Sequence, residues 1–224
     1  MGESLSSAFN EAAAPGDTRT LEKILTDWSV DFQKRDDGTL FVPGDFDISH
    51  FKVDALPDLT AVEVAGNFHC FDNNLTSLKG APRKVGGSFD CSENQLTSLE
   101  GAPASVGMNF YCHKNKLTSL EFAATDVGNA FRCDQNRLTS LKGAPEKVSG
   151  LFWCQGNLLT DLEYAPKLFR VLNSDFGEYK SWSEVPEGIQ LSAATRAQRE
   201  AEFVAQATVL QAPVQAIKTL SFRK

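Results

Sequence analysis

The sequence predicts a repeat solenoid, a coil in which one short structural unit stacks on the next. The phrase LTSL occurs four times at one interval, and five consecutive units align with a period of 21 residues. A unit this short cannot bury an apolar face alone, so its neighbours must cover it. We expect short parallel strands on one side of the coil, loop or extended chain on the opposite side, and helices at the N- and C-terminal ends.

The five units cover residues 66–169 and share columns of Phe, Cys, Asn and Leu. Phe and Cys alternate with a variable residue, and this period of two predicts a short strand with Phe and Cys inward. The Asn three residues after each Cys should end the strand and hydrogen-bond to the backbone of neighbouring coils. Both leucines of LTSL should point inward, and the following Pro should hold the chain extended. The Cys and Asn columns are Cys70, Cys91, Cys112, Cys133, Cys154 and Asn73, Asn94, Asn115, Asn136, Asn157.

The N-terminal flank, residues 1–65, predicts a helix, a hairpin and a degenerate coil. Leu21, Ile24, Leu25 and Trp28 recur at helical spacing, with Asp17 or Thr18 as the N-cap. The turn DDGT then separates two strands. Residues 44–64 fit the repeat with Ile48 in the Cys column, as expected of an atypical terminal unit.

The C-terminal flank predicts a last coil and a helix. Residues 170–191 read as a degenerate coil in which Tyr179 and Trp182 replace two leucines. Residues 192–224 carry an apolar helical stripe, which Pro213 should kink or split. This helix either packs on the last coil or is free for a homo-oligomer or a partner helix.

Composition and charge restrict the partners. The net charge of the 224 residues is −7, and residues 1–65 hold 13 acidic against 5 basic groups. No basic stripe is present, so nucleic acid is not an expected partner. No apolar run reaches the length of a membrane span, and the polar N-terminus lacks the regions of a secretion signal, so we expect no membrane contact and a cytoplasmic location.

Cysteine and histidine usage does not predict catalysis. Five Cys, an odd number without a CxxC motif, indicate buried thiols rather than disulfides, although stacked thiols from successive coils are an alternative metal site. The sequence contains three His and no phosphate-binding loop, HExxH or nucleophile elbow. We therefore expect no enzymatic activity, no cofactor and no metal.

The core pattern FxCxxNxLTSLxGAPxxVGG resembles the leucine-rich repeat family, in a Cys-containing form that is similar to repeats of tailed-bacteriophage and some bacterial proteins. The resemblance covers residues 66–169 closely. It implies a scaffold that binds a protein partner, and it leaves the partner open.

The variable positions around Phe and Cys are the expected binding face. Alternation points them away from the interior, and they include Tyr, Trp and Arg, which are enriched in interface hot spots. The alternative is an ordinary surface on which Trp153 packs under the C-terminal end. The candidate partner-binding residues are His69, Phe71, Asp90, Tyr111, His113, Arg132, Asp134, Trp153 and Gln155.

The sequence thus favours a non-enzymatic protein-binding module. The resemblance to phage repeats implies a phage-encoded modulator or inhibitor of a bacterial host protein, such as a defence protein, acting in the bacterial cytosol. Two other functions stay open. One is a structural or virion-associated component that oligomerises through its C-terminal helix, and the other is an acidic decoy of nucleic acid.

Overall fold

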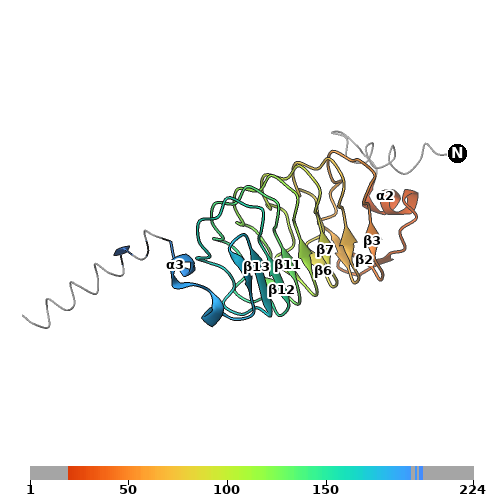
Figure 1. Cartoon of the computed structure of the whole chain (residues 1–224). Coiled ribbons are helices and arrows are strands. Elements are labelled where there is room, and N and C mark those ends of the chain that lie inside the picture. The colour runs from red at the N-terminus through yellow and green to blue at the C-terminus, as the bar shows by residue number, and fades with distance from the viewer. Residues whose placement is uncertain (1–19, 193–194, 196, 199–224) are drawn as a thin grey trace, which may run out of the picture.

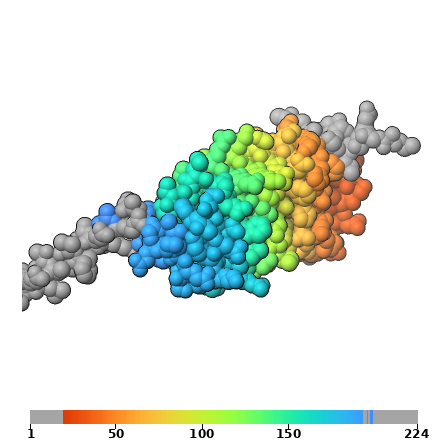
Figure 2. Space-filling view, in the orientation of Figure 1, coloured from red at the N-terminus to blue at the C-terminus, as the bar shows by residue number. Residues whose placement is uncertain are grey.

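A computed structural model describes residues 20–192, 195, 197 and 198. Its coils stack in one row, with helix α2 (Leu21–Asp27) at one end and helix α3 (Glu187–Gln190) at the other (Figure 1). Consecutive segments of sequence occupy consecutive slices of the surface (Figure 2). The expected solenoid of parallel strands is confirmed.

One side of the solenoid is an eight-stranded sheet with the order β14-β13-β12-β11-β9-β7-β5-β3. Its parallel register places Phe opposite Phe from coil to coil, as in the pairs Phe68↔Phe89 and Phe110↔Phe131. The 21-residue period therefore advances the chain by one strand. The strands are β3 (Phe46–Asp47), β5 (Phe68–His69), β7 (Phe89–Asp90), β9 (Phe110–Tyr111), β11 (Phe131–Arg132), β12 (Leu151–Trp153), β13 (Val171–Ser174) and β14 (Gly177–Tyr179).

The opposite side is also a sheet, which corrects our expectation of loop or extended chain there. Six strands pair in the order β1-β2-β4-β6-β8-β10, and all pairs except β1–β2 are parallel. In β6 and β8 the buried residue is the Val that follows the GAP turn, Val85 and Val106, and Val127 is its counterpart in β10. The strands are β1 (Gln33–Lys34), β2 (Leu40–Val42), β4 (Val62–Val64), β6 (Lys84–Val85), β8 (Ser105–Val106) and β10 (Asp126–Val127).

The core between the sheets consists of stacked columns of like residues. Rings of the Phe column lie 5.3–5.7 Å apart between Phe68 and Phe152 and are nearly parallel. All five Cys are fully buried, and so are the leucines of both columns except the half-buried Leu159. Such close packing restricts the volume of each column, because a larger side chain would separate adjacent coils.

The Asn column joins neighbouring coils, as the sequence predicts. Asn94 Nδ2 donates to the carbonyl oxygens of Cys70 at 2.9 Å and Cys91 at 3.2 Å, and Asn94 Oδ1 accepts from the backbone N of Leu75 at 3.0 Å. Asn115 and Asn136 repeat this pattern. Each amide therefore satisfies buried backbone groups of two coils at once.

The N-terminal end is covered by α2. Thr20 is its N-cap and accepts from the backbone N of Lys23, so the expected N-cap at Asp17 or Thr18 is wrong. Ile24, Leu25 and Trp28 are buried, and the Trp28 ring centroid lies 6.1 Å from that of Phe46, the first ring of the Phe column. Strands β1 and β2 form an antiparallel hairpin beside this helix.

At the C-terminal end the chain turns back instead of completing another coil. Strand β13 is parallel to β12 and puts Leu172 opposite Phe152, but β14 then pairs antiparallel with β13. The predicted placement of Tyr179 and Trp182 in leucine columns is wrong, since Tyr179 lies in β14 and Trp182 begins the 3-10 helix η1 (Trp182–Glu184). The expected helix over 192–224 falls almost wholly outside the described residues.

Candidate functional site

The candidate site is the outer surface of the eight-stranded sheet, which we call the strand face. It comprises the residues just before, between and just after the Phe and Cys columns. The position between Phe and Cys on each coil forms one row. The strand register places the residues of this row side by side in the order His69, Asp90, Tyr111, Arg132 and Trp153. All five side chains are half-buried. The sequence prediction that they lie side by side on one face is therefore confirmed.

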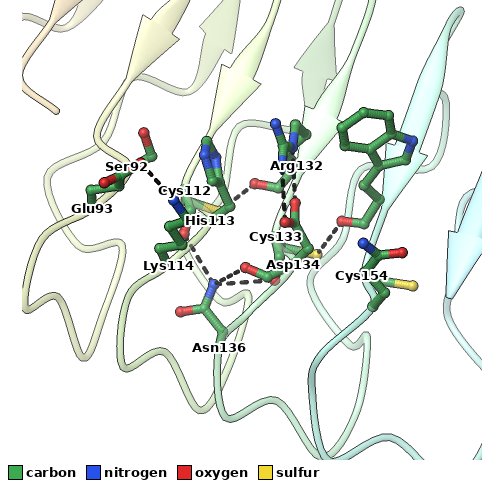
Figure 3. Close-up of polar contacts among 12 residues, drawn as sticks. Ser92, Glu93, Cys112, His113, Lys114, Arg132, Cys133, Asp134, Asn136 and Cys154 are labelled. Atoms are coloured by element: carbon green, nitrogen blue, oxygen red, sulfur yellow. Dashed lines mark hydrogen bonds and ion pairs between the residues drawn. The ribbon is translucent and has the colours of Figure 1, made fainter. Parts of the chain in front are cut away.

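Arg132 is held in place by two neighbours. Its Nε and Nη2 donate to the two carboxylate oxygens of Asp134, each at 2.9 Å (Figure 3). Its Cζ lies 4.3 Å from the ring centroid of Trp153. A two-point ion pair and a cation–π contact together fix the guanidinium on the outer surface.

Asp134 differs from its expected role as an exposed contact. Its side chain is only 1% exposed, while that of Arg132 is 28% exposed. The sequence places Asp134 correctly on the outer side of the strand but does not show that the longer Arg132 covers it. Asp134 therefore positions Arg132 and presents no surface of its own.

Tyr111 and His113 form the next group, on strand β9 and just after it. Their ring centroids lie 6.2 Å apart in an edge-to-face arrangement. Burial and the negative charge of Asp90 raise the pKa of Tyr111. Burial, followed by the Arg132 guanidinium, lowers the pKa of His113, so the imidazole is neutral at pH 7. Its Nδ1 is buried and has no hydrogen-bond partner in the described residues.

Asp90 is the second residue of this row and lies between the larger His69 and Tyr111. Its Oδ1 accepts from the backbone N of Ser92 at 3.0 Å and from Ser92 Oγ at 2.6 Å. Asp47 and Ser49 repeat this arrangement in the first coil. The short Ser49 and Ser92 side chains are buried, so on these coils the carboxylate is the main outward group.

Phe71 continues the aromatic surface toward the N-terminal end. Its ring centroid lies 6.0 Å from that of His69 and 4.7 Å from that of His50, edge to face in both cases. His50 Nδ1 is also 2.7 Å from Asp72 Oδ2. Gln155, at the other end of the face, is exposed.

The predicted set omits Asp47, a member of this face, and His50, which borders the face against Phe71. Both belong to the degenerate coil 44–64, and β3 pairs Asp47 with His69 in register. Ile48 lies in the Cys column as expected, because its backbone N donates to the His69 carbonyl in the way that Cys70 N donates to Asp90. Extending the outward columns by one coil finds Asp47 but not His50, which is two residues after Ile48 and lies outside these columns.

The Cys thiols lie in the interior. The five thiols are buried, and burial raises the pKa of each. Four of them donate to a carbonyl of the following coil, for example Cys112 Sγ to Arg132 O at 3.3 Å. In the described part of the chain, no three His, Cys, Asp or Glu side chains lie close enough to hold a metal ion.

A hollow lies at the GAP turns, away from the strand face. This hollow has a volume of about 600 Å³ and is lined among others by Thr60, Lys79, Arg83 and Glu100. It is open, and neither His nor Cys lines it. Over the residues described, no helix is both long and apolar enough to span a membrane.

Comparisons with protein-family models, with curated proteins and with solved structures find no match to this chain.

Proposed function

We propose that the protein is a non-enzymatic binding module that holds a protein partner on its strand face. The observation that supports this function is the row Tyr111, Arg132 and Trp153, which occupies the same position on three successive strands. The three side chains are partly exposed and restrained by ion-pair or ring contacts. Side chains that are already ordered lose little conformational entropy on binding.

The chemistry of this row suits a protein interface. Tyr, Trp and Arg dominate binding hot spots because they bury a large area and offer a polar group at the same time. Here the Arg132 charge is balanced by a buried carboxylate, so covering it with a partner would not leave an unpaired charge.

The kind of partner follows from the resemblance to phage and bacterial leucine-rich repeats. We propose a bacterial host protein whose activity the module alters, for instance a defence protein that it inhibits in the cytosol. The balanced charge of the repeats, with 10 acidic and 10 basic residues in 66–169, supports a protein partner over a nucleic acid.

Truncation of side chains on the strand face, with matched changes outside it, tests the proposal. We expect Trp153→Ala and Tyr111→Ala each to weaken capture of the partner by roughly thirty-fold, the usual loss when an interface anchor is removed. The matched controls Lys116→Ala and Arg137→Ala change exposed residues outside the strand face and should leave capture intact. The measurement is pulldown from bacterial lysate with quantitative mass spectrometry, followed by titration of the captured protein.

Thermal unfolding of each variant separates lost binding from lost structure. Trp153 and Tyr111 are outward residues, so their truncation should change the melting temperature little. The proposal is wrong if the strand-face variants retain the partner while truncation after Ile189 releases it, because the binding site would then lie in the C-terminal segment.

A further inference from the structure

The strand face contains one complete set of carboxylate, cation and aromatic ring. Asp134 binds the Arg132 guanidinium through both oxygens, and the guanidinium lies against the Trp153 ring at 4.3 Å. All three partners come from β11, β12 and the residues that follow β11. This set shows what the strand spacing of this sheet can accommodate: a cation from one coil fits against a ring of the next.

A second set on the same face lacks its cation. Asp90 is paired in register with His69 on one side and with Tyr111 on the other. Only its Oδ1 is used, by Ser92, and the described residues give Oδ2 no hydrogen-bond donor and no ion-pair partner. Burial and then the negative charge of Asp90 raise the pKa of Tyr111.

Rings flank this carboxylate on both sides. His69 and Phe71 belong to the preceding coil, and Tyr111 and His113 to the following one. The intervening coil contributes Asp90 and two buried residues, Ser88 and Ser92. Coils two apart are separated by roughly 10 Å. This spacing admits one flat or elongated cationic side chain between rings that are themselves about 3.5 Å thick.

The charge of the strand face points to the same kind of group. The outward positions from β3 to just after β13 hold five carboxylates: Asp45, Asp47, Asp90, Asp134 and Asp175. Arg132 is the single Lys or Arg among these positions, and Asp134 already pairs with it. The face is therefore net negative, and a basic partner is the complementary one.

We propose that the Asp90 position of the strand face binds an arginine or lysine side chain of the partner. The cation would pair with Asp90 Oδ2 and lie against the Tyr111 and Phe71 rings, as Arg132 pairs with Asp134 and lies against Trp153. This inference rests on the proposed function, since it names the chemistry of the partner that the strand face receives. Both ion pairing and cation–π attraction strengthen when the partner excludes water from the contact.

A hexa-arginine peptide tests the assignment directly, with hexa-citrulline as its neutral counterpart of nearly the same shape. Binding is followed by ¹⁵N–¹H NMR on the full chain, which detects weak association and locates it. We expect hexa-arginine to shift the amides around Phe71, Asp90 and Tyr111, and hexa-citrulline to shift none of them. Asp90→Asn, which keeps the oxygen that accepts from Ser92, should weaken binding at least about tenfold.

The control variant carries the same change on the other sheet. Asp126→Asn removes one exposed carboxylate from β10 and should not alter peptide affinity. Tyr111→Leu, which keeps an apolar side chain but removes the ring, should weaken binding several-fold. Equal losses from Asp90→Asn and Asp126→Asn, binding of hexa-citrulline, or no binding of hexa-arginine would each overturn the inference.

The same variants separate this inference from the proposed function. Should Trp153→Ala release the partner while Asp90→Asn retains it with unchanged affinity, the strand face is a binding site but the cation position is wrong. Retention of the partner by both variants would contradict the proposed function itself.

Discussion

At the scale of single residues, the Cys column illustrates how a repeat selects a side chain. Each thiol is fully buried, and four of the five donate a weak hydrogen bond to a carbonyl oxygen of the next coil. Cys is small, apolar and able to donate, so it fits a crowded interior next to a carbonyl oxygen. The column is therefore explained by packing.

Burial of the thiols predicts slow chemical labelling. We expect Cys91, Cys112 and Cys133 to react with a thiol reagent far more slowly than free cysteine in native buffer, because burial raises the pKa of each and blocks access. All five should react rapidly in denaturant. Labelling followed by mass spectrometry measures this, and reaction of Cys112 at the rate of a free thiol in the native protein would show that the column is open.

The raised thiol pKa values also predict a loss of stability at alkaline pH. The pKa of Cys112 rises from its ordinary value of 9.0 on folding, so the unfolded chain ionises first. This contribution to stability is fully present below pH 9 and is lost as pH rises above it, by about 1.4 kcal/mol per pH unit for each thiol. Denaturant titrations between pH 9 and 11 measure the slope.

Cys112→Ala provides the control for that slope. The variant should be less stable at every pH because it leaves a small cavity, but its free energy of unfolding should fall less steeply, by about 1.4 kcal/mol per pH unit. An unchanged slope would mean that Cys112 ionises equally in the folded and unfolded chains.

At the scale of the coil, the Asn column does more than end a strand. Asn115 Nδ2 donates to the carbonyls of Cys91 and Cys112, and its Oδ1 accepts from Leu96 N at 2.9 Å. Removing the amide leaves the buried Leu96 N–H unpaired, at a cost of about 1–3 kcal/mol. The two carbonyls lose one of two donors each, because Cys91 O also accepts from Asn94 and Cys112 O from Asn136. The three groups belong to two different coils, so the defect is shared between neighbours.

Asn115→Ala should therefore lower the free energy of unfolding by about 1–3 kcal/mol, as measured by chemical denaturation. Hydrogen exchange gives a local readout within the same variant. The Leu96 amide should lose protection because its acceptor is gone, while the Leu117 amide, which donates to Asn136 Oδ1, should keep most of it. Equal protection of both amides would mean that the side-chain bond to Leu96 contributes nothing.

The sequence predicts the structural elements that repeat along the chain. It does not predict elements whose sequence pattern is weak or whose structure depends on contacts with neighbouring residues. Columns of Phe, Cys, Asn and Leu predict the first sheet, because register follows directly from the period. The second sheet was missed because its strands, such as Lys84–Val85, contain a single fixed column, Val, whereas Phe and Cys alternate in two columns of the first sheet.

The candidate site shows the same limit. Outward positions such as Tyr111 and Trp153 follow from alternation, but the burial of Asp134 depends on the length of Arg132 two residues away. The return of β14 on β13 was also missed, because SDFGEY was matched to a degenerate coil although Gly177 allows a tight turn at a φ of 141°.

At the scale of the whole molecule, the solenoid is a one-dimensional stack. Each coil contacts the coils directly before and after it through the two sheets, the Phe column and the Asn column. Free energy in such a stack divides into terms for single coils and terms for adjacent pairs. Two changes should therefore influence each other only when their coils are neighbours.

Two double-mutant cycles that share Leu138 test this property. Leu75, Leu117 and Leu138 are fully buried members of one column, and each Leu→Ala change should cost about 2–5 kcal/mol. Leu117 and Leu138 lie on adjacent coils, so the two cavities share a wall and relax together, and we expect the double variant to deviate from additivity by about 0.5 kcal/mol or more. Leu75 and Leu138 lie three coils apart, roughly 14 Å along the axis, and their effects should add within about 0.5 kcal/mol.

Chemical denaturation of the five variants and the wild type measures both interaction energies. Because all three leucines make the same kind of contact, a large interaction energy for the distant pair could arise only through the coils between them, and it would show that the stack transmits strain beyond nearest neighbours.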